Sequence, residues 1–468
     1  MKNVALHNLG CKVNSYELDV VQQMLQENGY NIVSFDEKAD IYIVNTCTVT
    51  NMADRKSRQM LHRAKLLNPD SVVIAIGCYV QTGKEDIILD ESIDLAIGNN
   101  RKKDIVVIIE SYLKEKGLLQ ASIKVDKTLN NSTIIDINNT YEYEEMTLKK
   151  TAEHTRAYIK IQDGCNQFCT YCIIPYARGR VRSRRWEDIR QEIEGLAAAG
   201  YKEIVLTGIH ISSYGIDFEE EAWKDGESKE ALQADDRHDY SGNSKLIDLI
   251  ERIHEIPGLQ RIRIGSLEPR IVTKEFAQRL ASLERICPHF HLSLQSGCDA
   301  TLKRMNRHYT TKEYKESVEN LREAFERPAI TTDVIVGFPQ ETEEEFLETK
   351  SFLEQIGFFE MHIFKYSKRK GTIAAGMPGQ VPDPVKTIRS NELLALERKQ
   401  SKEFRGFYQG KEVAVLFEES KQIQGKNYQL GHTVDYVKVA LETEEDLVNQ
   451  IRNVIINGFL TEDILFSM

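Results

Sequence analysis

The sequence lacks the features that mark membrane and secreted proteins. No apolar run reaches the roughly 18 residues that a helix needs to cross a bilayer. The start, MKNVALHNLGCKVN, has no long apolar segment followed by a small-residue cleavage site, which a secretory signal requires. We therefore expect a cytoplasmic protein with no membrane partner, in a compartment where thiols stay reduced.

Acidic residues outnumber basic ones, 72 to 61, and cysteine is uncommon. The chain of 468 residues has a formal net charge of −11 and a pI of about 5.6, which argues against a general polyanion binder but permits a local basic site. Its eight cysteines are better interpreted as metal ligands or reactive thiols than as disulfides. With 41% hydrophobic and 28% charged residues, the composition is that of a globular protein of two or three domains.

The first block, residues 1–120, alternates between strand and helix patterns. The predicted strands are VALHNLG, IYIVNTC, SVVIAIGC and IDLAIGN, and helices are predicted over 15–28 and 52–67. Near-continuous apolar strands separated by helices indicate a parallel sheet covered on both faces. Residues 121–156 are polar and weakly periodic, so we expect a linker with one strand over 132–137.

Two further blocks follow. Residues 157–400 hold six strand patterns separated by helical ones, which predicts a partial (β/α)6 barrel with its active site at the carboxyl ends of the strands. An acidic stretch over 217–240 is expected to be a solvated loop. Residues 404–468 are rich in short strand and turn signals and predict a small antiparallel β-barrel. The predicted fold class is therefore α/β, with a small terminal β-barrel.

Three cysteines lie close together in DGCNQFCTYC, where Cys165, Cys169 and Cys172 have the spacing C-x3-C-x2-C. Three thiolates can bind three irons of a 4Fe–4S cluster and leave the fourth iron open to a small molecule. Zinc is the alternative. It would need a further ligand, and the nearby His154 lies on the other side of a predicted strand. The motif begins where the first barrel strand ends, at the expected functional rim.

A second set of three cysteines is spread along the first block. Cys11, Cys47 and Cys78 each lie at the carboxyl end of a predicted parallel strand, in LGCKVN, NTCTVT and IGCYVQ. Such ends line one crevice of an open α/β sheet, so the three thiols can converge without a short motif. The alternative is ordinary burial of cysteine in strands, which we expect for Cys287 and Cys298 because neither belongs to a pattern.

The C-x3-C-x2-C motif resembles the signature of the radical S-adenosylmethionine (SAM) superfamily. The resemblance implies that Cys165, Cys169 and Cys172 bind a 4Fe–4S cluster whose open iron holds SAM, and that one electron cleaves SAM to a 5′-deoxyadenosyl radical. Together with the second triad and the terminal β-barrel, the chain resembles the methylthiotransferase family over nearly its whole length. That likeness implies a second 4Fe–4S cluster, carrying the sulfur to be inserted, on Cys11, Cys47 and Cys78, and an RNA-binding TRAM domain at the carboxyl end.

The resemblance also implies a reaction and its partners. One SAM methylates sulfur on the second cluster, and another yields the radical that removes hydrogen from C2 of an adenine. The implied partners are a tRNA anticodon stem-loop, a reductase or flavodoxin-type electron donor, and a sulfur source.

Further segments resemble family motifs in the expected order. They are TGIHISSYG, RIRIGSLEP, HLSLQSG, DVIVGFPQETEEEF and KYSKRKGTIAAGM. Four residues in them lie at predicted strand ends and are candidate SAM contacts, with simple turn residues as the alternative: Gly208, Ser266, Gln295 and Gly337. One departure is Gln340, which stands where the family usually has glycine.

The amino-terminal motifs indicate a branch of the family. LGCKVNSYE and NTCTVTNMADRKSRQ resemble the branch that converts N6-threonylcarbamoyladenosine, next to the tRNA anticodon, to its 2-methylthio derivative. The alternatives are the isopentenyladenosine branch, the branch that modifies an aspartate of a ribosomal protein, and a non-catalytic iron–sulfur protein that binds RNA or carries clusters.

Basic residues follow both cysteine sets. YARGRVRSRRWEDIR comes directly after Cys172 and is expected to contact RNA phosphates or the SAM carboxylate, with a solvated arginine face as the alternative. Its arginines are Arg178, Arg180, Arg182, Arg184, Arg185 and Arg190. The same surface is expected to include Arg55, Lys56 and Arg58. The terminal block has more acidic than basic residues, and its candidate RNA contacts are Tyr428, Tyr436, Lys426 and Lys438.

Overall fold

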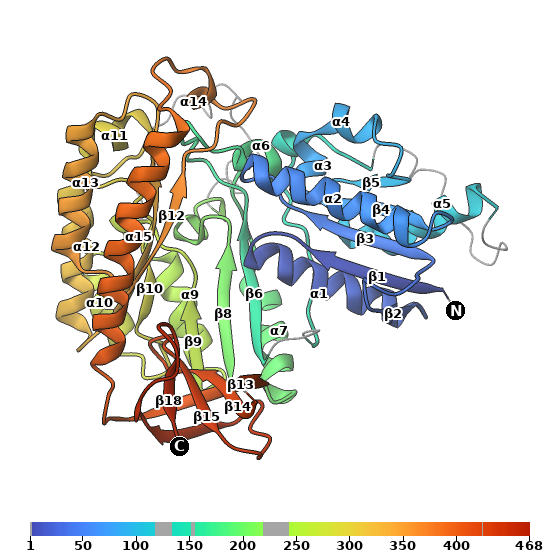
Figure 1. Ribbon diagram of the computed structural model, residues 1–468. Coiled ribbons are helices and arrows are strands. Elements are labelled where there is room, and N and C mark those ends of the chain that lie inside the picture. The colour runs from blue at the N-terminus through green and yellow to red at the C-terminus, as the bar shows by residue number, and fades with distance from the viewer. Residues whose placement is uncertain (1, 118–132, 151–154, 219–242, 424) are drawn as a thin grey trace.

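Five parallel strands form the first unit of the computed structural model, which describes residues 2–117, 133–150, 155–218, 243–423 and 425–468 (Figure 1). Their order is β2-β1-β3-β4-β5, so β1, β3 and β4 are neighbours. The strands are β1 (Asn3–Asn8), β2 (Asn31–Val33), β3 (Ile41–Thr46), β4 (Val72–Gly77) and β5 (Leu95–Ile97). The predicted parallel sheet is confirmed, and the short edge strand β2 is an addition to it.

Helices cover both faces of this sheet. They are α1 (Lys12–Glu27), α2 (Asn51–Leu67), α3 (Cys78–Thr82), α4 (Lys84–Ile88) and α5 (Ile105–Glu115). Apolar side chains of α1 and α5 pack in one core on the sheet, and those of α2 and α3 pack in another. Helix α2 begins where predicted because the Thr50 side chain accepts a hydrogen bond from the Ala53 N–H.

The predicted strand over 132–137 is wrong. The described residues of this segment run beside β5, but only the Gly98 N–H reaches a carbonyl there, that of Thr133, at 2.8 Å. The Ile135 carbonyl instead accepts from the Gln81 side chain, and the chain then turns into a 3-10 helix at Ile137–Asn139. The Gln81 side chain therefore provides a hydrogen bond where a strand would have paired with the backbone of β5. Ser132 and His154 lie outside the described residues.

The central unit is a partial barrel of six parallel strands, as predicted. One sheet has the order β7-β6-β8-β9 and the other β10-β11-β12, and isolated bridges such as Leu267 to Leu292 join them. The strands are β6 (Arg156–Asp163), β8 (Glu203–Gly208), β9 (Arg261–Ile264), β10 (His289–His291), β11 (Ala329–Val336) and β12 (Glu360–Lys365), and a short antiparallel β7 (Arg182–Ser183) borders β6.

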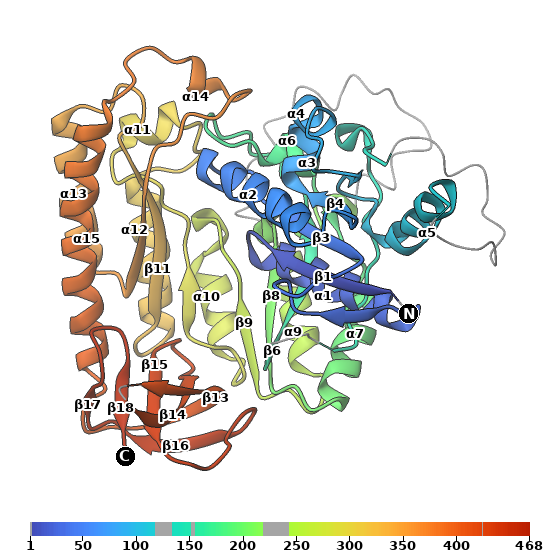
Figure 2. The same ribbon diagram turned by 45° about the vertical axis from the view of Figure 1, so that its right-hand side comes forward.

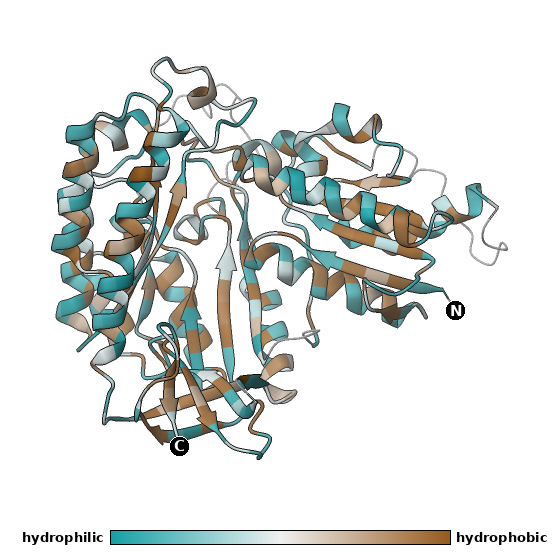
Figure 3. Cartoon of the chain, in the orientation of Figure 1, coloured by the Kyte–Doolittle hydropathy of each residue, from teal (hydrophilic) through white to brown (hydrophobic). Residues whose placement is uncertain are grey.

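Helices cover the outside of this barrel, and polar residues dominate their outer faces in Figure 3. They are α7 (Trp186–Ala198), α9 (Lys245–His254), α10 (Lys274–Ala281), α12 (Thr311–Ala324), α13 (Glu343–Ile356) and α15 (Asp383–Gly406). The shorter helices α6 (Ile174–Arg178), α11 (Asp299–Arg304) and α14 (Ile373–Gly376) lie at the carboxyl ends of the strands (Figure 1). Capping boxes begin α12 and α13. Most of the predicted acidic loop, residues 219–242, lies outside the described part of the chain.

The terminal unit is a six-stranded sheet of order β16-β13-β14-β15-β18-β17. Its strands are β13 (Glu412–Ile423), β14 (Lys426–His432), β15 (Lys438–Glu442), β16 (Ile451–Ile455), β17 (Gly458–Phe459) and β18 (Leu465–Ser467). Neighbouring strands are antiparallel as predicted, except that β15 and β18 are parallel. The unit lies at the amino-terminal ends of the barrel strands (Figure 1), where the Arg261 guanidinium donates to the Ala414 and His432 carbonyls.

The amino-terminal unit meets the barrel through α1, which contacts β6 and β8 (Figure 2). The carboxyl ends of β1, β3 and β4 are therefore brought close to the carboxyl end of β6. Among the residues that the structure describes, no helix is long and apolar enough to cross a membrane.

Candidate active site

The first cysteine triad lies at one edge of the amino-terminal sheet. Cys11 precedes α1 just after β1, Cys47 directly follows β3, and Cys78 directly follows β4 as the first residue of α3. The backbone of Gly10 has a φ of +136°, and a Cβ there would lie 3.3 Å from the Cys47 Cβ. Glycine thus lets the loop that carries Cys11 close onto Cys47.

The three thiols of this triad act on one another electrostatically. Burial raises the pKa of Cys47 to about 11, and negative charge on Cys78 or Cys11 adds to the effect. Such a thiol is protonated near neutral pH, and a metal must displace the proton to bind its sulfur. Without a metal, the Cys47 thiol is therefore expected to stay protonated.

The second triad occupies the loop between β6 and α6. The loop is closed at its start by a hydrogen bond of 3.0 Å from the Cys165 N–H to the Gly179 carbonyl. A further bond of 2.9 Å runs from the Cys172 N–H to the Cys169 carbonyl. Gly164 has a φ of +73°, and a Cβ there would collide with the Arg180 carbonyl, so only glycine fits between β6 and the first cysteine.

Burial also governs the thiols of the second triad. It raises the pKa of Cys165 to about 12, with a contribution from Cys169, and it raises the pKa of Cys172 with contributions from both other thiols. The Cys169 sulfur accepts a hydrogen bond of 3.3 Å from Nη1 of the half-buried Arg307. The loop thus combines three mutually interacting sulfurs with one fixed positive charge.

Both triads supply sulfur donors, the ligand type of an iron–sulfur cluster. Within the described residues, no three His, Cys, Asp or Glu side chains are grouped closely enough to hold one metal ion. The thiolates of a cubane cluster each bind a different iron, so they need not converge on one point. Cys287 and Cys298 are buried and belong to neither triad: one precedes β10 and the other precedes α11. Each triad therefore offers three sulfurs, the donor set that leaves one iron of a cubane open.

A buried ionic network connects the two units beside these triads. Its centre is Glu17 on α1, which is fully buried and forms ion pairs with Lys102, Lys160 and Arg178. Burial alone would raise the pKa of Glu17, but these three positive charges hold it well below its usual range. Asp163, at the end of β6, pairs with Lys160 at 2.6 Å in the same network.

Arg178 links this network to the first triad. Its Nε donates to the Cys78 sulfur at 3.2 Å, and its Nη2 donates to Oδ1 of Asn14 at 2.6 Å. Because Arg178 follows Cys172 by one short helix, a single side chain joins the loop of one triad to a sulfur of the other. The sequence patterns did not reveal Glu17, but a carboxylate on the apolar face of α1, beside Tyr16 and Val20, is a signal for a buried cationic partner.

The prediction that five arginines of this segment face RNA is wrong for three of them. Arg178, Arg182 and Arg184 are at most 1% exposed, and each is held by protein groups. Arg182 donates to the Arg178 carbonyl, and Arg184 pairs with Glu192. Arg180 and Arg185 are exposed, as is the sixth arginine, Arg190.

A second contact joins the units on the far side of Cys47. Arg369, in the loop after β12, donates to the Thr48 hydroxyl at 2.7 Å and also binds Asn51 and Asp54. A few residues on, the Ala374 N–H donates to the carbonyl of Thr170, inside the second triad loop. The two triad loops are thus braced against each other at two points, and neither contact was evident from sequence patterns.

The four candidate SAM contacts all lie at the carboxyl ends of barrel strands, on the rim that carries the second triad. Gly208 ends β8, Ser266 is exposed after β9, Gln295 follows β10 with a φ of 73°, and Gly337 follows β11 with a φ of 71°. Gln340 has a φ of 66°, a left-handed conformation that glycine adopts at lower cost. Its departure from the usual glycine therefore falls where the backbone favours glycine.

The terminal candidates are mostly engaged within the protein. Tyr428 is 4% exposed, which contradicts the prediction that it contacts RNA, since it packs against Phe466. Tyr436 is stacked between His289 and His432 at the junction with the barrel. Lys426 and Lys438 are in ion pairs with glutamates of the same sheet.

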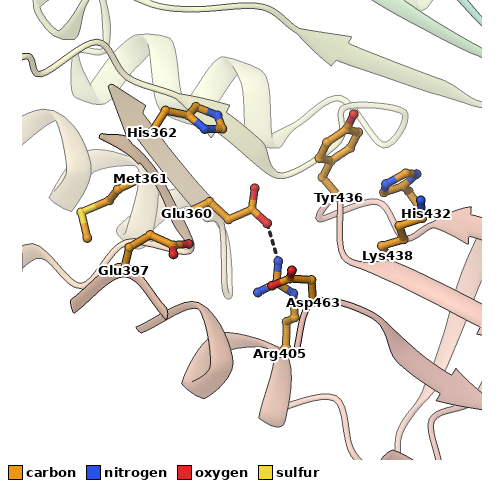
Figure 4. Close-up of a pocket in the computed structure, with 9 residues that line it drawn as sticks. All are labelled: Glu360, Met361, His362, Glu397, Arg405, His432, Tyr436, Lys438 and Asp463. Carbon is orange, nitrogen blue, oxygen red and sulfur yellow. Dashed lines mark hydrogen bonds and ion pairs between the residues drawn. The ribbon is translucent and has the colours of Figure 1, made fainter. Parts of the chain in front are cut away.

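A cavity of about 450 Å³ lies beside Tyr436, between the start of β12, helix α15 and the terminal sheet (Figure 4). Its charged walls include Glu360, paired with Arg405, and also Glu397 and Asp463. It opens at the amino-terminal end of β12, whereas the triads lie at the carboxyl ends of the strands. It is therefore separate from the triads.

Comparison with known proteins decides the family. The Radical SAM superfamily matches residues 159–353, and the Uncharacterized protein family UPF0004 matches residues 3–98. A Bacillus subtilis (strain 168) protein named threonylcarbamoyladenosine tRNA methylthiotransferase MtaB is 39% identical over 452 residues, which cover 96% of this chain and 93% of that protein. The chain belongs to the methylthiotransferase family of radical SAM enzymes. As such, its cofactors are SAM and 4Fe–4S clusters.

Other relatives agree with this assignment. An Aquifex aeolicus protein of the same name as the B. subtilis relative is 38% identical, over 91% of this chain and 95% of its own. A Thermoanaerobacter sp. (strain X514) tRNA-2-methylthio-N(6)-dimethylallyladenosine synthase is 33% identical, and the match covers 97% of the present chain and 90% of the synthase. Among solved structures, the radical SAM methyltransferase TsrM from Kitasatospora setae superposes with a TM-score of 0.52 at 16% identity, covering 78% of this chain and 73% of TsrM, which supports the shared fold.

Proposed function

We propose that this methylthiotransferase converts N6-threonylcarbamoyladenosine, next to the anticodon of tRNA, to its 2-methylthio derivative. The observation that carries the proposal is the pair of three-cysteine triads braced against each other by Arg178 and Arg369. We assign one 4Fe–4S cluster to each triad: Cys11, Cys47 and Cys78 hold one, and Cys165, Cys169 and Cys172 hold the other. Two named relatives act, by their names, on threonylcarbamoyladenosine in tRNA, which supports the substrate.

The barrel rim is proposed to position SAM. When bound, SAM and the cluster of the second triad supply the radical chemistry. Gly208 and Gly337 lie at the strand ends, where protein atoms pack close to both backbones and only glycine fits, and Ser266 and Gln295 offer polar side chains from the neighbouring strand ends. The electron and the sulfur must come from outside the chain, from a reductase or flavodoxin-type donor and a sulfur source.

The RNA-facing surface is proposed to consist of the exposed basic residues around both triads. Arg55 and Lys56 are exposed on α2, after Cys47, and Arg180 and Arg185 are exposed after Cys172. The Arg180 guanidinium lies 4.6 Å from the Phe168 ring centre. Anticodon loops expose phosphates and unstacked bases, for which a cation beside an aromatic ring is a suitable contact.

Lys12 supports the threonylcarbamoyl branch over the isopentenyl branch. It directly follows Cys11, is exposed, and makes no hydrogen bond or ion pair within the part of the chain that the structure describes. Desolvation by the protein around it, followed by the positive charges of Arg156 and Arg263, lowers the pKa of Lys12 to about 8, and an anion there would stabilise its charged form. A threonylcarbamoyl group carries a carboxylate, whereas an isopentenyl group is neutral.

We expect Lys12→Gln to lower kcat/KM for RNA containing N6-threonylcarbamoyladenosine by about 10- to 100-fold, the effect of losing one charged hydrogen bond of roughly 1.5–3 kcal/mol. Formation of 5′-deoxyadenosine without RNA is expected to be unchanged. The matched control is Lys38→Gln, an exposed lysine of the same unit. Equal loss in both variants, or none in Lys12→Gln, would contradict this role.

The function is tested with anaerobically reconstituted enzyme, SAM, dithionite and sulfide. The substrate is tRNA that carries N6-threonylcarbamoyladenosine but lacks the 2-methylthio group. Nucleosides are then analysed by liquid chromatography and mass spectrometry. We expect the 2-methylthio derivative of N6-threonylcarbamoyladenosine. Methylthiolation of isopentenyladenosine or of a ribosomal-protein aspartate instead would overturn the substrate, and a failure to form 5′-deoxyadenosine would favour a non-catalytic iron–sulfur protein.

A further inference from the structure

Each cysteine triad has one sulfur that accepts a hydrogen bond from an arginine, and of the two arginines Arg178 is fully buried and Arg307 is half-buried. Arg178 donates to Cys78 from Nε at 3.2 Å, and Arg307 donates to Cys169 from Nη1 at 3.3 Å. The two arginines come from different parts of the chain: Arg178 is the last residue of α6, and Arg307 follows α11. Arginine keeps its positive charge in proteins, so both side chains act as fixed cations.

Arg178 is held so that its charge cannot move away from the sulfur. Its other two nitrogens are committed to Asn14 and to Glu17, and its side chain is fully buried. The single negative charge of Glu17 is shared, because Glu17 also forms ion pairs with Lys102 and Lys160, whose side chains are almost fully buried. Asp163 also pairs with Arg178, at 3.3 Å, and with Lys160, at 2.6 Å. In this network three cations, Lys102, Lys160 and Arg178, therefore face two carboxylates.

Arg307 is fixed by a different set of contacts. Its Nε donates to the Tyr309 hydroxyl at 3.1 Å, and its Nη2 donates to the Ser293 carbonyl at 3.4 Å. The guanidinium also lies 4.8 Å from the Tyr309 ring centre. Tyr309 is itself anchored by a bond of 2.6 Å to the Leu294 carbonyl. Within the described residues no carboxylate forms an ion pair with Arg307; Glu268 interacts with it electrostatically but is itself paired with Arg270 at 2.9 Å.

We propose that Arg178 and Arg307 are positioning residues that separately raise the reduction potentials of the clusters held by the first and the second triad. The inference rests on the proposed assignment of one cluster to each triad. Reduction adds one electron to a cluster, and a fixed positive charge that donates to a ligand sulfur stabilises the more negative, reduced form. Removing that charge makes reduction harder and shifts the potential downward.

The test is a redox titration of the full-length enzyme with both clusters, in which dithionite supplies the electron and electron paramagnetic resonance reports the reduced clusters. The Cys169→Ala protein, which keeps only the first triad intact, assigns the signals. We expect Arg178→Gln to lower the potential of the first-triad cluster and Arg307→Gln to lower that of the second-triad cluster, each with a much smaller effect on the other cluster.

Conservative variants separate charge from folding. Arg178→Lys and Arg307→Lys keep a cation, so we expect each to lower the potential of its cluster by less than the glutamine variant does. The control is Arg184→Lys, which changes a buried arginine that pairs with Glu192, and among the described contacts none joins it to a cysteine. We expect it to leave both potentials unchanged. Iron analysis of every variant identifies loss of a cluster.

Two outcomes would contradict the inference. One is a full complement of iron with unshifted potentials in both glutamine variants. The other is an equal shift of both potentials by either variant, which indicates a general structural effect. If a glutamine variant loses its cluster, the lysine variant decides. Lysine keeps the charge but cannot reproduce the geometry of the guanidinium, so a partial downward shift of the potential is expected. An unshifted potential would contradict the role. A wild-type protein with about four irons instead of about eight would instead refute the cluster assignment on which the inference rests.

Discussion

Cys169→Ala is expected to lose about half of the iron of the reconstituted enzyme and all formation of 5′-deoxyadenosine from SAM. Cys169 is one of three sulfurs in a buried loop, and removing it leaves two ligands for a cluster that needs three. The other triad lies on a separate sheet and keeps its own three sulfurs. Iron analysis and chromatography of the SAM products after anaerobic reduction measure both effects.

Two further variants make this result specific. Cys298→Ala removes a buried cysteine outside both triads and is expected to retain the iron and the SAM cleavage of the wild type. Cys47→Ala is expected to lose the same share of iron but to keep forming 5′-deoxyadenosine, while methylthiolation stops. Wild-type iron in Cys169→Ala, or a loss of SAM cleavage in Cys298→Ala, would contradict the assignment of the triads.

The cysteine positions were predictable because strand order and strand ends follow from local patterns. Apolar runs such as IYIVNTC predict buried parallel strands, and the carboxyl ends of such strands meet at one edge. The structure places Cys47 and Cys78 directly after β3 and β4, which are neighbours in the sheet. Local sequence patterns were thus enough to predict the positions of both triads, even though the first is spread over residues 11 to 78.

The arginines were not predictable in the same way. A run such as RGRVRSRR looks solvent-exposed unless its partners are known, and the partners of Arg178 are far away in sequence. Glu17 lies 161 positions earlier, and Cys78 lies 100 positions earlier. Their meeting depends on how α1 docks against β6, which no local pattern specifies. The same holds for Arg369 and Thr48, which are 321 positions apart.

Glu17→Gln is expected to lower the free energy of unfolding by about 3–5 kcal/mol, because it leaves buried cations without their carboxylate. Glu17 is fully buried and pairs with Lys102, Lys160 and Arg178, and the amide of glutamine cannot balance their charge. The pKa of Glu17 is well below its usual range, so its contribution is present above the unfolded pKa and is lost only as pH falls through the folded value. The difference between variant and wild type is therefore expected to persist across neutral and mildly acidic pH.

Urea unfolding followed by circular dichroism measures this effect. The control is Glu27→Gln, at the other end of the same helix, where the pair with Lys149 is exposed and its loss is expected to cost under about 1 kcal/mol. Because the carboxylate of Glu17 also holds Arg178 in place, Glu17→Gln should loosen the contact between the two units, and proteolysis near α1 should become faster. Equal stability of the two variants would show that Asp163 and Asn99 alone can hold the buried cations of this network.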